Sequence, residues 1–203
     1  MIDWFANVSV LEAIAVVFAI AYLVLAIRQS ALCWPAGLVS VALSLVLFYD
    51  ARLYMEALLQ VFYIAISIYG WYEWRFGGAR HEGVAIRLWS PRTHAACIAL
   101  IALASVGFGA VLARTTNAAL PYVDSFTTVA AIVTTYMVAK KILENWLYWF
   151  VIDAVSVYLY RMRELDLYAA LFVFYLLLVV VGFRRWLIDW RAQQTAAEAL
   201  QHG

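Results

Sequence analysis

Long apolar stretches separated by short polar gaps make up the chain from residue 8 to residue 183. A helix needs about 20 mainly apolar residues to cross the hydrocarbon core of a bilayer. The stretches are continuously apolar rather than alternating, which favours helices over the strands of a membrane barrel. The pattern therefore predicts seven transmembrane helices, at 8–27, 32–49, 54–72, 93–113, 121–139, 145–160 and 167–183.

Composition supports an all-α integral membrane protein. Of the 203 residues, 67% are hydrophobic and 13% are charged, whereas a soluble domain is about half apolar and a quarter charged. The net charge of +1 indicates no basic face for nucleic acid. The first apolar stretch lacks an obvious cleavage site and is interpreted as a retained helix rather than a signal peptide. We expect a single membrane domain over 1–203.

Lysine and arginine divide unevenly between the two sides of this seven-helix arrangement. Four lie in the gaps of one side and ten in those of the other. Because positive residues favour the cytoplasmic side, the bias predicts an inner (plasma) membrane protein with its N-terminus outside and its C-terminus in the cytoplasm. The ten residues are Arg28, Arg75, Arg80, Arg87, Arg92, Lys140, Lys141, Arg184, Arg185 and Arg191.

The chain also contains an internal repeat at an offset of 112 residues. Between residues 34 and 74, 13 of 41 positions are identical to the residue 112 positions later. The identities go beyond common aliphatic residues: Trp34 falls on Trp146, Tyr63 on Tyr175, Gly70 on Gly182 and Trp74 on Trp186.

The offset carries the first three predicted helices onto the last three in the same sense across the membrane. We therefore expect a parallel 3+1+3 internal repeat, with three-helix repeats at 1–75 and 121–186 and a linker helix at 93–113. Parallel repeats of this kind are known in transporters, with the substrate near the bilayer midplane between the repeats.

A carboxylate lies deep within the sixth predicted helix, at Asp153. A charge at the bilayer centre costs at least about 2.5 kcal/mol, so it needs a partner, water or a ligand. Trp146, Trp149 and Asp153 are spaced to share one helical face, and indoles beside a carboxylate suit a flat cationic ring. The alternative is a structural aspartate hydrogen-bonded to a neighbouring Ser, Thr or Tyr.

Two further sets of polar residues are candidates for handling a substrate. Gln60, Tyr63 and Ser67 follow one another at helical spacing in the third predicted helix, although a membrane glutamine also bonds to neighbouring helices. Glu12 and Asp124 lie near the outer ends of their helices. Each is either a gate or a charge favoured by the helix dipole.

Histidines and cysteines form no catalytic or metal-binding pattern. The three histidines fall outside the predicted helices or at their edges, and there is no intramembrane Ser–His pair, CxxC motif or nucleotide-binding glycine loop. We expect no enzyme activity, no metal, no cofactor and no ATP-driven pumping by this chain alone.

Two motifs resemble those of PnuC-type vitamin transporters. Residues 58–63 with 67–74 are similar to the third-helix signature of that family, and residues 144–149 with Asp153 and Ser156 to its sixth-helix signature. The resemblance covers nearly the whole chain and implies a SWEET-like fold. It also implies uptake of nicotinamide riboside by facilitated diffusion, made one-way by a cytoplasmic vitamin kinase. The substrate-binding residues it implies are Gln60, Tyr63, Ser67, Trp71, Trp146, Trp149 and Asp153.

The chain departs from this pattern at Asp153 and Ser67, where nicotinamide riboside carriers tend to have Asn. The family includes thiamine and riboflavin relatives. Because nicotinamide riboside and thiamine are cationic, Asp153 suits either on charge, and neutral riboflavin fits less well. Nicotinamide riboside ranks first and thiamine second. A non-transporting membrane sensor or scaffold is the competing class, and it leaves the repeat unexplained. The oligomeric state stays open, a homo-oligomer being one alternative.

Overall fold

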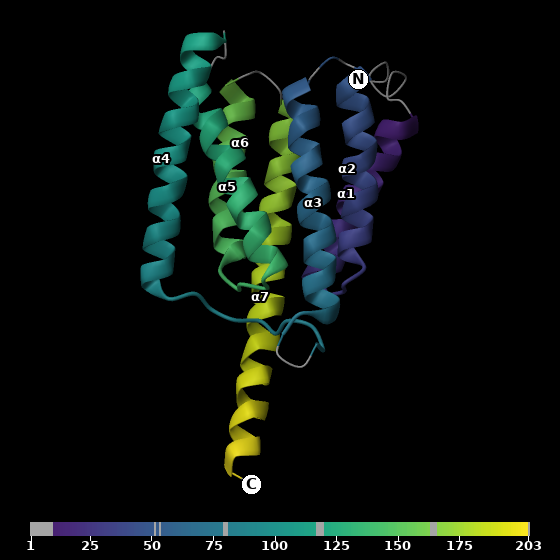
Figure 1. The fold of residues 1–203 in the computed structure, drawn as a ribbon, viewed down its shortest axis with the longest axis vertical. Coiled ribbons are helices and arrows are strands. Elements are labelled where there is room, and N and C mark those ends of the chain that lie inside the picture. The colour runs from purple at the N-terminus through teal and green to yellow at the C-terminus, as the bar shows by residue number, and fades with distance from the viewer. Residues whose placement is uncertain are drawn as a thin grey trace. The chain divides into compact units, whose positions relative to one another are not determined.

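The chain folds into seven α-helices in the computed structural model, which describes residues 10–50, 52, 54–78, 81–116, 120–162 and 166–202 (Figure 1). All seven predicted helices are present, although residues 8 and 9 lie outside the described part. The helices are α1 (Val10–Ile27), α2 (Cys33–Asp50), α3 (Tyr54–Phe76), α4 (Pro91–Thr115), α5 (Pro121–Ala139), α6 (Asn145–Met162) and α7 (Asp166–His202).

Five of these helices are long and apolar enough to cross a membrane, namely α1, α2, α4, α5 and α7. The other two, α3 and α6, are rich in tyrosine and tryptophan. The prediction of an all-helical membrane protein is confirmed. The two more polar helices are also the ones that carry most of the candidate ligand-binding residues.

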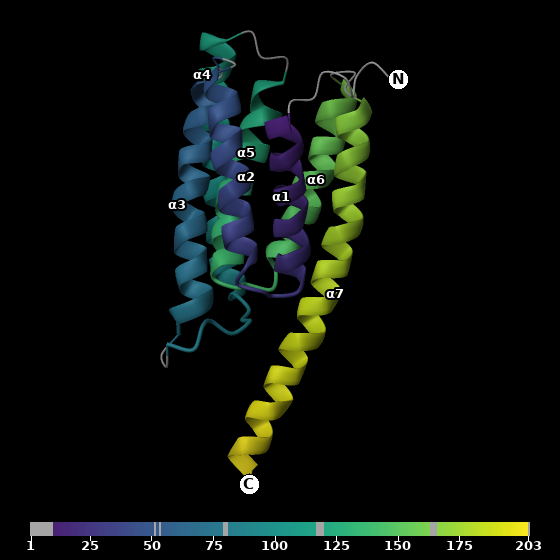
Figure 2. The ribbon, with the colours of Figure 1, turned by 90° about the vertical axis from the view of Figure 1, so that its right-hand side faces the viewer.

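The chain divides into two compact units, Met1–Ala85 and Ile86–Gly203. In the first unit α1 packs on α2 and α2 packs on α3, as Figure 2 shows. In the second unit α4 packs on α5, α5 on α6 and α6 on α7. The boundary between the units falls in the gap between the predicted first repeat and the predicted linker helix.

The turns that follow α1 and α5 have the same backbone geometry. Gln29 and Lys141 both adopt the left-handed conformation, with φ of 55° and 49°. Both turns have the Schellman pattern, which ends a helix by satisfying its last carbonyls. The N–H donors and carbonyl acceptors are Gln29 to Ala26 (3.0 Å), Ser30 to Leu25 (3.0 Å), Lys141 to Val138 (2.9 Å) and Ile142 to Met137 (2.9 Å).

A tryptophan near the start of α2 fixes how α2 packs on α3. Trp34 is 1% exposed, and its six-membered ring lies against the backbone of Gly70, where a Cβ would overlap it. Trp74, one helical turn further along α3, meets the same indole edge-on, with ring centroids 5.6 Å apart. The missing side chain of Gly70 therefore makes room for the indole.

The second unit contains the same arrangement between α6 and α7. Trp146 is 2% exposed and lies against Gly182, where a Cβ would be 2.5 Å from its Cη2 and Cζ3 atoms. Trp186 meets it edge-on, with ring centroids 5.5 Å apart.

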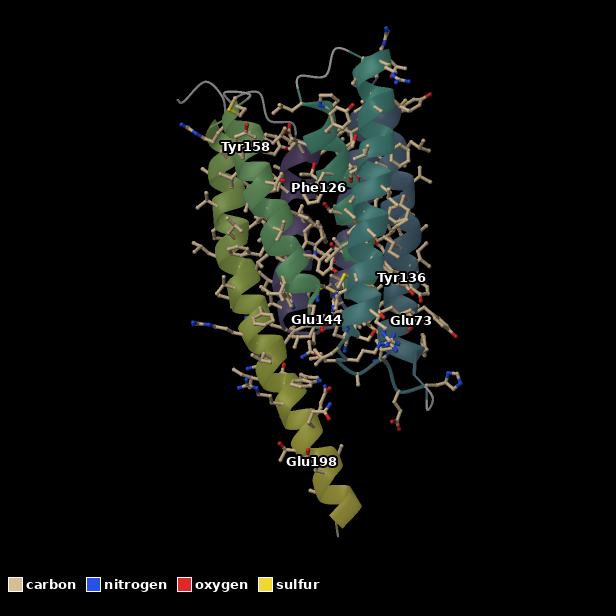
Figure 3. The ribbon with its side chains drawn as sticks, turned by 90° about the vertical axis from the view of Figure 1, so that its left-hand side faces the viewer. Glu73, Phe126, Tyr136, Glu144, Tyr158 and Glu198 are labelled. Carbon is tan, nitrogen blue, oxygen red and sulfur yellow. The ribbon has the colours of Figure 1, made fainter. Side chains whose placement is uncertain are left out.

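The last helix is much longer than the sequence pattern predicts. The sequence pattern predicts an end at residue 183, but α7 continues to His202. Figures 1 and 3 show its far part extending beyond the ends of α5 and α6, and Figure 3 labels Glu198 on it. The prediction ended where the apolar residues end. No Gly or Pro interrupts residues 184–202, which are rich in Ala, Gln and Arg, and these residue types have high helix propensity.

Candidate ligand-binding residues

Asp153 is a buried carboxylate in the middle of α6, with 4% of the residue exposed. Within the part of the chain that the structure describes, its side chain has no hydrogen-bond or ion-pair partner. Tyr175 on α7 lies close enough to interact with it electrostatically. The hydrogen bond that a purely structural aspartate would need is thus absent among these residues. A buried charge without such a bond is unfavourable unless a counter-ion or ligand compensates it.

Trp149 lies one helical turn before Asp153 and is half-buried. Its indole packs against an apolar cluster formed by Ile101, Ala130 and Ile152 from three helices of the second unit. This packing restricts the indole while part of its surface stays open. An indole held in this way can stack on a flat ring at little cost in side-chain entropy.

Trp146 is used for packing in this structure. Its ring contacts Gly182 and Trp186, and its indole N–H is buried without a hydrogen-bond partner among the described residues. Helical spacing puts it on the same face as Asp153, but its surroundings hold α6 against α7. A direct contact between Trp146 and a ligand stays a prediction.

The candidate residues of α3 differ in exposure. Gln60 and Tyr63 are half-buried, and Ser67 is buried and donates its hydroxyl to the main-chain carbonyl of Tyr63 at 2.7 Å. The Ser67 oxygen keeps its capacity to accept a hydrogen bond. Trp71 is 40% exposed and meets Phe76 edge-on at 5.6 Å.

Glu12 and Asp124 occupy the first turns of α1 and α5. An acidic side chain is stabilised there by the helix dipole, and this accounts for both residues without a gate. The gating role stays a prediction.

A polar cluster that the sequence did not reveal joins α4 to the start of α6. His94 Nδ1 lies 2.9 Å from Tyr148 Oη, and its Nε2 lies 3.3 Å from Glu144 Oε1. The other Glu144 oxygen accepts a hydrogen bond from the main-chain N–H of Trp89 at 3.4 Å, and Figure 3 shows Glu144 at the beginning of α6. These contacts fasten the predicted linker helix to the second repeat. No group of His, Cys, Asp or Glu within the described ranges is arranged to hold a metal ion.

Tyr22 is a second residue that the sequence did not single out. It lies on α1, meets Trp34 edge-on with ring centroids 5.9 Å apart, and is near Tyr63. It therefore lies beside the candidate residues of α3. No local pattern marks it, because it is one of 13 tyrosines in an aromatic-rich chain.

Apolar helices long enough to span a bilayer, with a buried carboxylate in one of the more polar helices, define a multi-pass membrane protein. The chain belongs to the nicotinamide mononucleotide transporter family, whose model matches residues 9–188. The resemblance to PnuC-type transporters is thereby confirmed, as is the expectation of a transporter rather than an enzyme.

Individual relatives agree with this assignment. The nicotinamide riboside transporter PnuC of Escherichia coli K12 is 26% identical over 221 residues, covering 97% of this chain and 92% of the relative. The riboflavin/roseoflavin transporter RibM of Streptomyces davaonensis is 32% identical over 174 residues, covering 81% and 78%. A crystal structure of the vitamin B3 transporter PnuC has the same fold, with a TM-score of 0.72 at 23% identity, covering 94% of this chain and 86% of that one.

Proposed function

We propose that this protein carries nicotinamide riboside across the bacterial inner membrane by facilitated diffusion. Family membership supports a vitamin transporter, and the full-length similarity to a nicotinamide riboside carrier supports this substrate. The observation that carries the proposal is Asp153, a buried carboxylate without a hydrogen-bond partner in the described structure. It suits a ligand whose ring is cationic.

In this proposal each unit contributes its own ligand-binding residues. In the second unit Trp149 stacks on the pyridinium ring and Asp153 balances its charge. Trp146, on the same face of α6, is a further proposed ligand-binding residue. A cation desolvated against an indole gains about 2 kcal/mol or more. In the first unit Gln60, Tyr63, Ser67 and Trp71 supply hydrogen bonds and an aromatic surface. Glu12 and Asp124 are proposed gates.

We also propose that all seven helices cross the membrane as a parallel 3+1+3 repeat. At the offset of 112 residues, the last residue of α1 falls on the last residue of α5, and α2 begins and ends where α6 does. The first residue of α3 likewise falls on the first residue of α7. The matching Schellman turns and tryptophan–glycine contacts support the same assignment. Residues 1–75 and 121–186 are then the repeats, and 93–113 is the core of the linker helix.

The proposed orientation has the C-terminus in the cytoplasm. In the first unit the Trp34–Trp74 contact brings Arg28 and Arg75 to one end of the helices. The corresponding contact in the second unit does the same for Lys140 and Lys141 with Arg184 and Arg185. Most Lys and Arg residues of each unit thus belong to the end proposed to face the cytoplasm, where a vitamin kinase would trap the substrate.

Riboflavin is a second candidate because RibM, the more identical of the two relatives described, carries riboflavin or roseoflavin. Thiamine remains a candidate because it shares the positive charge. A panel of nicotinamide riboside, thiamine and riboflavin, titrated against the purified full-length protein in detergent, separates them. We expect nicotinamide riboside to bind most tightly. Tightest binding of riboflavin would reassign the substrate, and no binding of any of the three would contradict the proposal.

Proteoliposomes test the mode of transport. Labelled nicotinamide riboside should equilibrate across the membrane without a proton or sodium gradient, because no chain of charged residues beyond Asp153 runs through the predicted helices. Accumulation above equilibrium that collapses on addition of an uncoupler would contradict facilitated diffusion.

A further inference from the structure

We propose that Tyr22 is a specificity-determining residue that donates a hydrogen bond to the hydroxyl-bearing, uncharged part of the ligand. This inference rests on the proposed function. It assigns a ligand-binding residue to α1, where the sequence motifs indicate none. Its basis is the set of contacts that hold the Tyr22 ring and the polar groups beside it.

The ring of Tyr22 is held by two residues of α2. The Cδ2 atom lies 2.9 Å from where a Cβ of Gly37 would be, so the ring fits only because that position has no side chain. The indole of Trp34 meets the ring edge-on, with centroids 5.9 Å apart and planes at 67°. Trp34 is in turn fixed by Gly70, so the phenol is positioned by the same packing that joins α2 to α3.

The polar groups around this phenol have unused hydrogen-bonding capacity. Tyr22 lies near Tyr63, whose ring meets Phe62 edge-on at 5.6 Å. The side chains of Tyr22, Tyr63 and Gln60 have no hydrogen-bond partner in the portion of the chain that the structure describes. Buried or half-buried phenols and amides normally have partners. Two phenols and an amide offer both donors and acceptors, and carry no charge, which suits a ligand's hydroxyl groups.

The second unit has no such phenol at the corresponding positions. The offset of 112 residues puts Thr134 where Tyr22 is and Trp149 where Gly37 is, and the Thr134 hydroxyl donates to the carbonyl of Ala130 at 2.7 Å. The aromatic ring thus comes from α1 in the first unit and from α6 in the second. The first unit therefore offers neutral hydrogen-bonding groups at this position, which suit the hydroxyl groups of the proposed ligand.

The test compares two cationic pyridinium probes that differ in the sugar. Nicotinamide riboside carries ribose hydroxyls and 1-methylnicotinamide does not. In Tyr22→Phe the ring contacts with Gly37 and Trp34 are kept and only the hydroxyl is lost. We expect affinity for nicotinamide riboside to fall about fivefold, the effect of losing one neutral hydrogen bond, and affinity for 1-methylnicotinamide to stay unchanged.

Gly37→Ala provides a second variant that leaves every hydroxyl in place but displaces the Tyr22 ring. It should produce the same selective loss. Tyr72→Phe is the matched control, because Tyr72 is 53% exposed on α3, and it should change neither affinity. An equal effect on both probes, or no effect in the folded Tyr22→Phe protein, would overturn the role of Tyr22. If the wild-type protein binds neither probe, it is the proposed function that fails first.

Discussion

In the first unit α2 begins with Cys33, and in the second unit α6 begins with Asn145; both side chains are fully buried. Four residues further along, Gly37 corresponds to Trp149, and four residues after that Val41 corresponds to Asp153. The residues that pack the helices together are, in contrast, the same in the two units. Trp34 and Trp146 lie in nearly the same surroundings, each against a glycine and a second tryptophan.

This difference separates two tasks within one backbone plan. Tryptophans and glycines determine how neighbouring helices pack, and the two units share them. One face of α2 and α6 differs between the units, being small and apolar in one and aromatic and acidic in the other. The packing residues should therefore control stability, and the differing residues should control which ligand binds.

The largest effect is expected from filling the two shared glycines. Gly70→Ala and Gly182→Ala each put a methyl group into an indole that cannot move without disturbing a second tryptophan. Overpacking of this kind costs about 1–3 kcal/mol, and we expect both variants to lose that much stability in thermal unfolding followed in detergent. The matched control is Gly107→Ala on α4, where no atom lies within 4 Å of the added Cβ. A loss in only one of the two variants would break the correspondence between the units.

Trp149→Ala should weaken the binding of nicotinamide riboside and of its reduced, uncharged form alike. Stacking on an aromatic side chain contributes about 1–3 kcal/mol per ring, which corresponds to a loss of roughly tenfold or more in affinity. Titration of nicotinamide riboside and of its reduced, uncharged form measures the effect on both. Phe150→Ala, at an exposed neighbouring position on α6, should leave both affinities unchanged. Loss in the Phe150 variant as large as in the Trp149 variant would remove Trp149 from the binding residues.

Asp153→Asn should distinguish charge from shape. The substitution keeps the size and planar shape of the side chain and one of its acceptor oxygens, and it removes the charge. Affinity for cationic nicotinamide riboside should fall about tenfold or more, because the pyridinium charge loses its buried counter-charge, and affinity for the uncharged reduced riboside should hold. Equal losses for the two ligands in the folded variant would mean that Asp153 does not pair with the ligand's charge.

These residues also show what the sequence can and cannot predict. The sequence alone marks Asp153, because a carboxylate in an apolar stretch has no local explanation, and the polar gaps predict the helix boundaries apart from the end of α7. The contact of His94 with Glu144 joins residues 50 positions apart and has no local pattern. Spacing along one helix placed Trp146 on the same face as Asp153 but could not reveal that its ring packs against Gly182 on another helix. No sequence pattern marks Tyr22, because its ring packs against Gly37 on a different helix.

The end of α7 gives the smallest expected effect and a direct comparison with α3. The last residue of α3, Phe76, corresponds to Ile188 at the offset of 112 residues, so the helix beyond that point has no counterpart in the first unit. The side chains of residues 191–199 are exposed.

A chain ending at Arg191 keeps the ion pair of Arg185 with Asp189, 3.4 Å apart, and the contact of Trp186 with Trp146. Its thermal unfolding and its affinity for nicotinamide riboside should match the full chain within about 0.5 kcal/mol, as for exposed substitutions. A chain ending at Arg185 is the matched control, because it also loses Trp186, and it should be clearly destabilised. If the longer truncated chain binds or transports less than the full protein while remaining folded, the extension has a function that the three-helix plan of the first unit does not include.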